Sequence, residues 1–395
     1  MTATAPIYLD HAASAPLDPR VAAVMLECLA DPSLQANPSS AHAAGRAAAQ
    51  RIATARAQVA ALIGAPPEAI VFTSGATESV NLAILGAARA ADRARRHVIT
   101  SRIEHHAGRE ACRQLEREGF EVTWLKPARE GFVEPGRVAE ALRPDTALVS
   151  LMHANNETGV LNDVDTVAAL CRERGVVLHV DAAQSAGKVP IDVAASGIAL
   201  LSFCAHKLGG PKGAGALYVR RRPRPALQPL QFGGSHEGGL RPGTLPTHQL
   251  AGFGAACELA RSALATEGPR IRALRERLWI ALQAAAPLWR NGAPEPSVPG
   301  ILNVGFAGAE GESLLLELDR GLAVASGAAC SSATAEPSAV LRALGRSDLA
   351  IQASLRLSLG RDTTAQDVDR AAALLVAAVQ RLRDALPAGA LERIA

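Results

Sequence analysis

Residues 70–78 read IVFTSGATE, in which the apolar strand Ile70–Thr73 runs into a turn of small residues and then opens a helix. This strand-to-helix pattern recurs along the chain to about residue 220. Several of the strands are apolar throughout, which is typical of strands covered on both faces. The pattern predicts an α/β fold whose large domain has a mostly parallel sheet sandwiched by helices. Further strands are expected at His97–Thr100, Val122–Leu125, Leu148–Met152, Val176–Asp181, Leu200–Cys204 and Gly215–Val219, with helices at Glu78–Ala91, His106–Glu118 and Val164–Arg174.

The pattern changes after about residue 245. A long helix, His248–Ala286, leads to a loop rich in Pro and Gly, and short strands and helices follow before a final helix at Ala365–Leu386. We therefore predict a smaller α+β C-terminal domain of ordinary domain size. Residues 15–260 are expected to form the large domain, and residues 1–14 and 261–395 the small one. The strands of the small domain are expected at Ile301–Phe306, Leu322–Ala325 and Ser354–Leu359.

Composition excludes several classes of protein. The chain has 395 residues, is 48% hydrophobic and carries a formal net charge of +3, which gives no electrostatic footprint for nucleic acid. No segment reaches the roughly 18 uninterrupted apolar residues that a membrane span needs, and the N-terminus lacks the basic and apolar regions of a signal peptide. We therefore expect a cytoplasmic protein that contacts neither nucleic acid nor membrane directly.

The six cysteines lack the close spacing of a zinc site, and a disulfide framework is not expected in a large apolar chain without a signal peptide. No metal site is predicted. Cys204 ends an apolar strand, where burial would raise its pKa and keep it inert. The cysteines expected to be small buried hydrophobic residues within helices are Cys28, Cys112, Cys171 and Cys257.

Polar residues follow three of the predicted strands, at the strand ends where open α/β sheets bind ligands. The turn after Thr73 exposes backbone N–H groups and the positive end of a helix dipole, which suits a phosphate. An ordinary helix start with Thr77 as its N-cap is the alternative for this segment. Asp181 ends a buried strand, so its carboxylate needs a partner, such as a protonated pyridine nitrogen or a local turn.

Lys207 follows the third strand, directly after His206 and before a glycine-rich loop. A lysine becomes a Schiff-base nucleophile when desolvation or neighbouring cations lower its pKa. Lys212 competes for this role, but it lies within the flexible glycine-rich loop. The phosphate turn, Asp181 and Lys207 together predict a pyridoxal-phosphate enzyme in which Lys207 carries the cofactor.

The chain carries, in this order, the motifs Ser74-Gly75-Ala76-Thr77-Glu78-Ser79, Glu104-His105-His106, Asn155-Asn156-Glu157-Thr158-Gly159, His179-Val180-Asp181-Ala182-Ala183-Gln184 and His206-Lys207. In these motifs and their order it resembles the cysteine desulfurases, which are fold-type I pyridoxal-phosphate enzymes of the class V aminotransferase group. The likeness runs nearly end to end, from Tyr8–Ala13 to Ser358–Arg361. Each motif alone is weakly specific, but the set is highly specific.

The resemblance implies a role for each residue around the cofactor ring. Lys207 would bind pyridoxal phosphate as a Schiff base, and Asp181 would face the pyridine nitrogen. Gln184 would contact the ring hydroxyl, and Asn156 would lie beside the ring substituents and the substrate. His105 would stack over the ring face and exchange protons with the substrate.

The resemblance also implies which residues hold the phosphate. Ala76, Thr77 and His206 would bind it, and Thr244 would reach it from the partner subunit, which implies a homodimer. Members of this family usually have a phosphate-binding serine at the position of Cys204. Because a thiol is a weaker donor than a hydroxyl, we expect a somewhat weaker grip on the phosphate here.

Cys330 lies in Ala325–Ser332, a run of small residues that buries little surface and is therefore expected to form a mobile, exposed loop. In the family that this chain resembles, the nucleophilic cysteine lies here, so the resemblance implies that Cys330 takes sulfur from L-cysteine as a persulfide. Arg356, on an apolar strand, is expected to clamp the substrate carboxylate, because a guanidinium binds a carboxylate through two parallel hydrogen bonds.

The leading hypothesis is a cysteine desulfurase that converts L-cysteine to L-alanine and passes sulfur to an acceptor protein, such as an iron–sulfur scaffold, or towards tRNA thiolation. A selenocysteine lyase or an aminotransferase of the same fold is the close alternative, and Cys330 in its small-residue loop favours the desulfurase. A non-catalytic interaction protein is the alternative of another class. The presence of Lys207, Asp181 and His105 argues against it.

Overall fold

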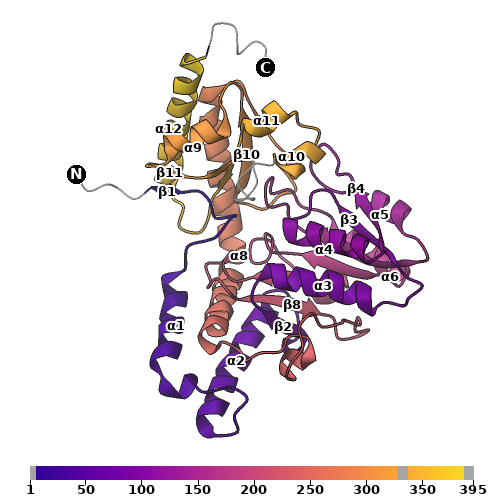
Figure 1. Cartoon of the computed structure of the whole chain (residues 1–395). Coiled ribbons are helices and arrows are strands. Elements are labelled where there is room, and N and C mark those ends of the chain that lie inside the picture. Colours follow the sequence, from indigo (N-terminus) through magenta and orange to yellow (C-terminus); the bar gives the residue numbers. More distant parts are fainter. Residues whose placement is uncertain (1–5, 327–336, 387–395) are drawn as a thin grey trace.

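The computed structural model describes residues 6–326 and 337–386 (Figure 1). Its larger sheet has seven strands in the order β2-β8-β7-β6-β5-β3-β4. β8 is antiparallel to both of its neighbours, and the other strands run parallel to one another, which confirms the predicted mostly parallel sheet. The strands are β2 (Ile70–Thr73), β3 (His97–Ser101), β4 (Glu121–Leu125), β5 (Thr146–Met152), β6 (Val177–Asp181), β7 (Leu200–Cys204) and β8 (Gly215–Val219).

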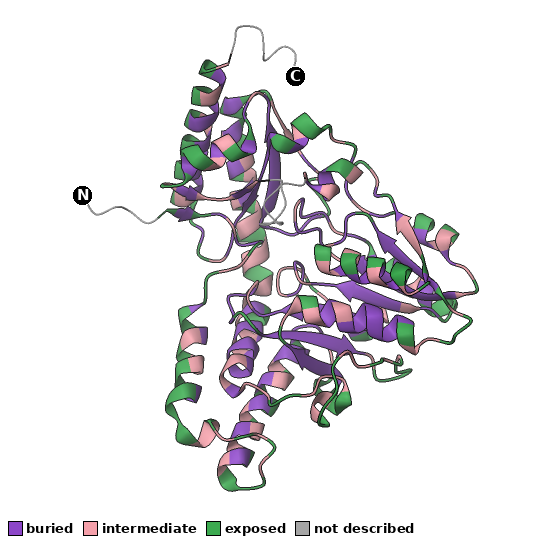
Figure 2. Cartoon of the chain, in the orientation of Figure 1, coloured by how far each residue is buried: buried purple, intermediate pink, exposed green. Residues whose placement is uncertain are grey.

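Helices cover both faces of this sheet, as predicted. Successive residues of a strand point to opposite faces, so Leu148 packs in the core with α3 and α4, whereas Val149 packs in the core with α2, α6 and α8. Figure 2 shows the strands buried between helices whose outer faces are exposed. The helices of this part are α1 (Pro19–Ala30), α2 (Ala43–Ala61), α3 (Ala76–Ala90), α4 (His106–Arg117), α5 (Pro135–Ala141), α6 (Val164–Glu173), α7 (Val193–Ser196) and α8 (Thr247–Leu282).

A second hydrophobic core forms around a four-stranded antiparallel sheet of order β12-β13-β10-β9. The long helix α8 joins the two cores: Phe253 in its first half packs in the larger core, and Leu278 and Leu282 near its end pack in the smaller one. The predicted domain boundaries stay a prediction. The smaller part contains β9 (Leu288–Arg290), β10 (Ile301–Phe306), α9 (Gly311–Leu318), β12 (Ala325–Ser326), α10 (Ala339–Ala343), α11 (Asp348–Gln352), β13 (Ser354–Ser358) and α12 (Ala365–Asp384).

The strand predicted at Leu322–Ala325 is two short strands in different sheets. β11 (Leu322–Ala323) pairs in parallel with the N-terminal strand β1 (Ile7–Tyr8), whereas β12 pairs with β13. The chain changes its pairing partner at Val324, which an apolar run in the sequence does not reveal. Across the described ranges, no helix combines the length and apolar character that a membrane crossing requires.

Gly215 controls how closely the turn after β2 approaches the sheet. It pairs with Thr73 at the end of β2, and a Cβ atom on Gly215 would lie 2.5 Å from the Cα atom of Gly75. Gly75 is the N-cap residue of α3 and has no side chain with which to cap the helix. The position of the α3 N-terminus therefore depends on a glycine in the neighbouring strand.

Glu104, between β3 and α4, is a carboxyl group buried within the larger part of the fold. Its Oε1 atom accepts a hydrogen bond of 2.5 Å from Ser101 Oγ. Burial raises the pKa of Glu104 to about 8, because the charged form is poorly solvated there. The folded chain therefore holds this proton at neutral pH.

Gly215→Ala is expected to lower the free energy of unfolding by about 2 kcal/mol, because backbone atoms of the turn must move to admit the new methyl group. Urea unfolding measures this change. Gly136→Ala is the matched control, since a Cβ at Gly136 in α5 meets no atom within 4 Å. Equal unfolding midpoints for the two variants would contradict the tight packing of the turn.

Glu104→Gln is expected to change how stability depends on pH. The folded protein keeps the Glu104 proton up to about pH 8, whereas the unfolded chain loses it near the ordinary glutamate pKa of 4.5. This group therefore contributes stability that is present at about pH 5 and is lost as the pH rises through about 8. The variant should be no more stable than wild type at pH 5 but more stable at pH 9, by about 3 kcal/mol.

Urea unfolding of the cofactor-free protein across this pH range checks the expectation for Glu104. Glu140→Gln, which changes an exposed glutamate of α5, is the control and should leave the pH profile unchanged. If the profile of Glu104→Gln runs parallel to that of wild type, the buried carboxyl is not protonated in the fold.

Candidate active site

A cavity of about 600 Å³ lies at the carboxyl ends of the central parallel strands. Segments far apart in the sequence line it, because the turn after β2, the ends of β5, β6 and β7, and β13 of the smaller sheet all reach it. The sequence-predicted residues that the structure brings together here are Ala76, Thr77, His105, Asn156, Asp181, Gln184, His206, Lys207 and Arg356.

The N-terminus of α3 forms one end of the cavity. The helix begins at Ala76 with Gly75 as its N-cap, so Thr77 lies within the first turn and the alternative that it caps the helix is wrong. The nearest carboxylate, Glu78, accepts the N–H of Ser74 at 2.6 Å and pairs with Arg241 at 3.0 Å. The first-turn N–H groups of α3 therefore remain for an anion in the cavity.

Asp181 provides the buried carboxyl group of the site. It ends β6, and its Oδ1 atom accepts the N–H of Ala183 at 2.9 Å. Burial raises the pKa of Asp181, while Lys207 and the hydrogen bond from Ala183 act in the opposite direction. A cation placed in the cavity beside this carboxylate would favour its charged form.

His105 faces the cavity as the N-cap residue of α4. Its Nδ1 atom accepts the N–H of Ala107 at 3.2 Å. Burial, together with Lys207 and His106, lowers the pKa of His105 to about 4. The ring is therefore neutral at pH 7, and because Nδ1 is the acceptor, Nε2 carries the proton.

Lys207 and His206 follow β7, and both line the cavity. Burial and the nearby lysines lower the pKa of His206 to about 4. Its Nδ1 atom lies 3.3 Å from Ser14 Oγ. The competing Lys212 also reaches the cavity, but its side chain is exposed, whereas that of Lys207 is half-buried.

Gln184 and Asn156 are both buried in the wall of the cavity. Gln184 Nε2 donates to Ala12 O at 2.8 Å, and Gln184 Oε1 accepts from Lys188 Nζ at 3.0 Å. Asn155 holds the neighbouring loop, because its Oδ1 atom accepts the backbone N–H groups of residues 157 and 158.

Arg356 enters the cavity from β13 and is buried. One guanidinium nitrogen, Nη2, pairs with Asp10 Oδ1 at 2.8 Å, and Nη1 donates to the backbone oxygen of Asn156 at 3.1 Å. These contacts join the smaller sheet, the N-terminal segment and the loop after β5. Arg356 is thus a buried cation held in place by its partners, not a solvated surface arginine.

Among the described residues, two that the sequence predicts for the site, Cys204 and Thr244, do not line this cavity. Cys204 is buried at the end of β7, and burial raises the pKa of its thiol, as predicted. Thr244 is exposed and does not line the cavity, so its contribution to a partner subunit stays a prediction. Cys330 lies outside the described residues.

The helical cysteines are buried free thiols, as predicted: Cys28, Cys112, Cys171 and Cys257. Sequence reasoning missed two residues of the site. Asp10 lies within the Tyr8–Ala13 motif but has no predicted role there, and Lys188 has none either. Lys188 lies four residues after Gln184 in a turn segment, which is the one signal that could have directed attention to it. In the described part of the chain, no group of three or more His, Cys, Asp or Glu residues could hold a metal ion.

The chain is similar to known proteins over nearly its whole length. A model of the aminotransferase class-V family matches residues 7–371. The cysteine desulfurase IscS of Aeromonas hydrophila is 51% identical over 383 residues, which are 97% of this chain and 95% of that protein. The cysteine desulfurase IscS of Salmonella typhi is 50% identical with the same coverage.

Solved structures agree with this relationship. A NifS-like protein superposes with a TM-score of 0.88 at 32% identity, covering 95% of this chain and 99% of that one. DndA from Streptomyces lividans superposes with a TM-score of 0.76 at 41% identity, covering 89% and 99% of the two chains. The chain therefore belongs to the aminotransferase class-V family and, within it, to the cysteine desulfurases.

Proposed function

We propose that this enzyme converts L-cysteine to L-alanine with pyridoxal 5'-phosphate as its cofactor and delivers the sulfur as a persulfide on Cys330. The observation that carries the proposal is that Lys207, Asp181 and Arg356 line one cavity. An amine, a buried carboxyl group and a buried guanidinium are what an amino-acid-transforming pyridoxal site requires.

The side chains present fit this cofactor. The N-terminus of α3, with Ala76 and Thr77, would hold the phosphate together with His206. Asp181 would pair with the protonated ring nitrogen, which gives this buried carboxylate the cationic partner that burial otherwise denies it. Lys207 would bind the cofactor covalently.

The remaining wall would orient the ring. Gln184 would donate to the ring hydroxyl, and Asn156 would lie beside the ring substituents. His105 would stack over the ring face, and its neutral state suits stacking beside a cationic ring. When bound, the cofactor supplies an electron sink for the bond-breaking steps at the substrate Cα.

The chain's own residues then act on the substrate in order. Arg356 binds the substrate carboxylate, and Lys207, once released, removes the Cα proton. The Cys330 thiolate attacks the substrate sulfur, so that an S–S bond forms as the C–S bond breaks and the bond electrons stay with the substrate carbon. Protonation of that carbon and return of a proton to Cα give alanine, and His105 is placed to exchange protons with the substrate.

Two alternatives of the same fold, a selenocysteine lyase and an aminotransferase, share Lys207 and Asp181. The relatives at 50% and 51% identity are named cysteine desulfurases, and the small-residue segment around Cys330 agrees with that activity. A non-catalytic interaction protein would have no use for a buried arginine and carboxyl group around one cavity.

The proposal extends to partners and location. We expect a homodimer in which Thr244 of each subunit serves the phosphate of the other, because Thr244 is exposed and outside its own cavity. The persulfide would pass to an acceptor protein, such as an iron–sulfur scaffold, or towards tRNA thiolation. A cytoplasmic location is consistent with such acceptors.

Cys330→Ala is expected to abolish persulfide formation and to reduce alanine release from L-cysteine by at least about a hundredfold, because the sulfur acceptor is missing. Cofactor binding should be unchanged. Alanine and protein-bound persulfide are measured together after incubation with L-cysteine. Cys28→Ala, which alters a buried thiol of α1, is the control, and undiminished alanine release by the Cys330 variant would refute the persulfide mechanism.

Arg356→Lys is expected to raise the KM for L-cysteine by about tenfold, because an ammonium cannot bind the carboxylate through two parallel hydrogen bonds. The cofactor dissociation constant should change little. Steady-state kinetics and cofactor titration separate these effects. Arg342→Lys, in an exposed ion pair with Asp348, is the matched control; a KM for Arg356→Lys equal to that of the control would assign the carboxylate to another residue.

A further inference from the structure

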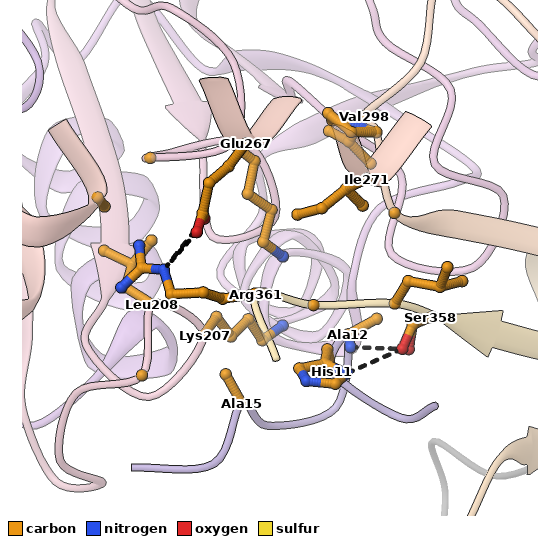
Figure 3. A pocket seen from close by; sticks show the side chains of 18 of the residues that line it. His11, Ala12, Ala15, Lys207, Leu208, Glu267, Ile271, Val298, Ser358 and Arg361 are labelled. Carbon is orange, nitrogen blue, oxygen red and sulfur yellow. Dashed lines mark hydrogen bonds and ion pairs between the residues drawn. The ribbon is translucent and has the colours of Figure 1, made fainter. Parts of the chain in front are cut away.

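Lys207 borders two cavities. Besides the cofactor cavity, a second cavity of about 100 Å³ lies between α8 and the end of β13. We call this second cavity the rear cavity. Figure 3 shows Lys207, His11 and Ala12 beside it, together with the ion pair of Arg361 with Glu267. Ala12 and Lys207 line both cavities, so these residues form part of the wall between them.

A hydrogen bond crosses this wall. Lys188 lines the rear cavity and Gln184 lines the cofactor cavity. Lys188 Nζ donates to Gln184 Oε1 at 3.0 Å, and Gln184 Nε2 donates to Ala12 O at 2.8 Å. Gln184 is only 2% exposed, so water cannot readily replace either partner.

The two neighbours leave the Gln184 amide one orientation. A lysine amine donates to Oε1, and a backbone carbonyl can only accept from Nε2. If the amide turned over, Oε1 would face Ala12 O, and because both of these atoms are acceptors that hydrogen bond would be lost. The amide has a second N–H on Nε2, which is the donor left over for an acceptor in the cofactor cavity.

We propose that Lys188 is a positioning residue, which acts from the rear cavity to hold the Gln184 amide so that its remaining N–H faces the ring hydroxyl of the cofactor. This inference rests on the proposed function, since it needs pyridoxal phosphate in the cofactor cavity. Lys188 itself lies behind Gln184 and touches the cofactor only through it.

The surroundings of Lys188 suit a neutral or weakly charged donor. Burial and the nearby Lys207 lower the pKa of Lys188 to about 7. A neutral amine still donates a hydrogen bond, so the bond to Gln184 persists above this pH and strengthens below it. The ionisable groups that act on Lys188, or on which it acts, are Lys207, Cys204, Arg356, His11 and His206.

The test is a double-mutant cycle on cofactor binding, measured by titrating the cofactor-free protein with pyridoxal phosphate. Lys188→Met is expected to weaken binding by about threefold to tenfold, the typical net contribution of one hydrogen bond. In a Gln184→Leu background the same change should alter binding by less than about twofold, because its target is gone. Lys188→Arg keeps a donor and should recover part of the loss.

A spectroscopic readout accompanies the cycle. The pH at which the absorption of the bound cofactor changes should shift in Lys188→Met, because the hydrogen bond to the ring hydroxyl is altered. Lys126→Met removes an exposed lysine that lines neither cavity. It is the matched control and should leave both binding and absorption unchanged. Circular dichroism and urea midpoints confirm that each variant is folded.

The outcomes separate the two levels of proposal. If wild type fails to bind pyridoxal phosphate, the proposed function falls, and this inference with it. If wild type binds and Lys188→Met binds equally well, only the role of Lys188 is overturned. An equal loss in the presence and absence of Gln184 also overturns it, because Lys188 would then act through its charge near Lys207. Should Lys188→Met not fold, Lys188→Ala, which also removes the donor, decides the same question in both backgrounds.

Discussion

His179 is wholly buried in β6 and ties this strand to both of its neighbours. Its Nδ1 atom lies 2.8 Å from Ser150 Oγ on β5, and its Nε2 atom lies 2.9 Å from Ser202 Oγ on β7. Burial lowers the pKa of the ring to about 3, so the neutral imidazole offers one donor and one acceptor, which two hydroxyl groups can match. A slip of one residue would turn these side chains to opposite faces. The strand ends that deliver Asp181 and Lys207 therefore arrive in one register.

Burial favours the neutral form of most ionisable groups around the site. It raises the pKa of Glu104 to about 8 and lowers that of His105 to about 4 and that of Lys188 to about 7. Burial also raises the pKa of Asp181, which favours its neutral form. Since a buried charge needs a partner, a cavity walled in this way favours a ligand that carries its own charges. In the proposed arrangement, the phosphate of the cofactor would bring its charge to the α3 N-terminus and the protonated ring nitrogen would bring its charge to Asp181.

The strands of the larger sheet could be predicted because buried parallel strands are continuous apolar runs, and Asp181 and Lys207 could be found because they end such runs. The sequence could not reveal partners that the fold supplies from elsewhere. Asp10 meets Arg356 across 346 residues of chain. A lysine in a turn is ordinarily solvated, so only the folded structure shows that Lys188 lines the cavity behind Gln184 and donates to it. In both cases the role comes from a contact that forms when the chain packs, and such a contact leaves no local pattern in the sequence.

Arg356 shows why the site needs two sheets. Its strand, β13, pairs with β10 of the smaller sheet, while its guanidinium contacts Asp10 and the loop after β5. Asp10 bridges to Ser358 on the same strand β13 as Arg356. A substrate carboxylate that binds Arg356 would therefore share this cation with Asp10. Because Arg356 and Asp10 are both held at β13, binding draws on geometry already in place and orders few further side chains. The smaller sheet thus presents Arg356, the proposed substrate-binding group, to a cavity that is lined mainly by residues of the larger part.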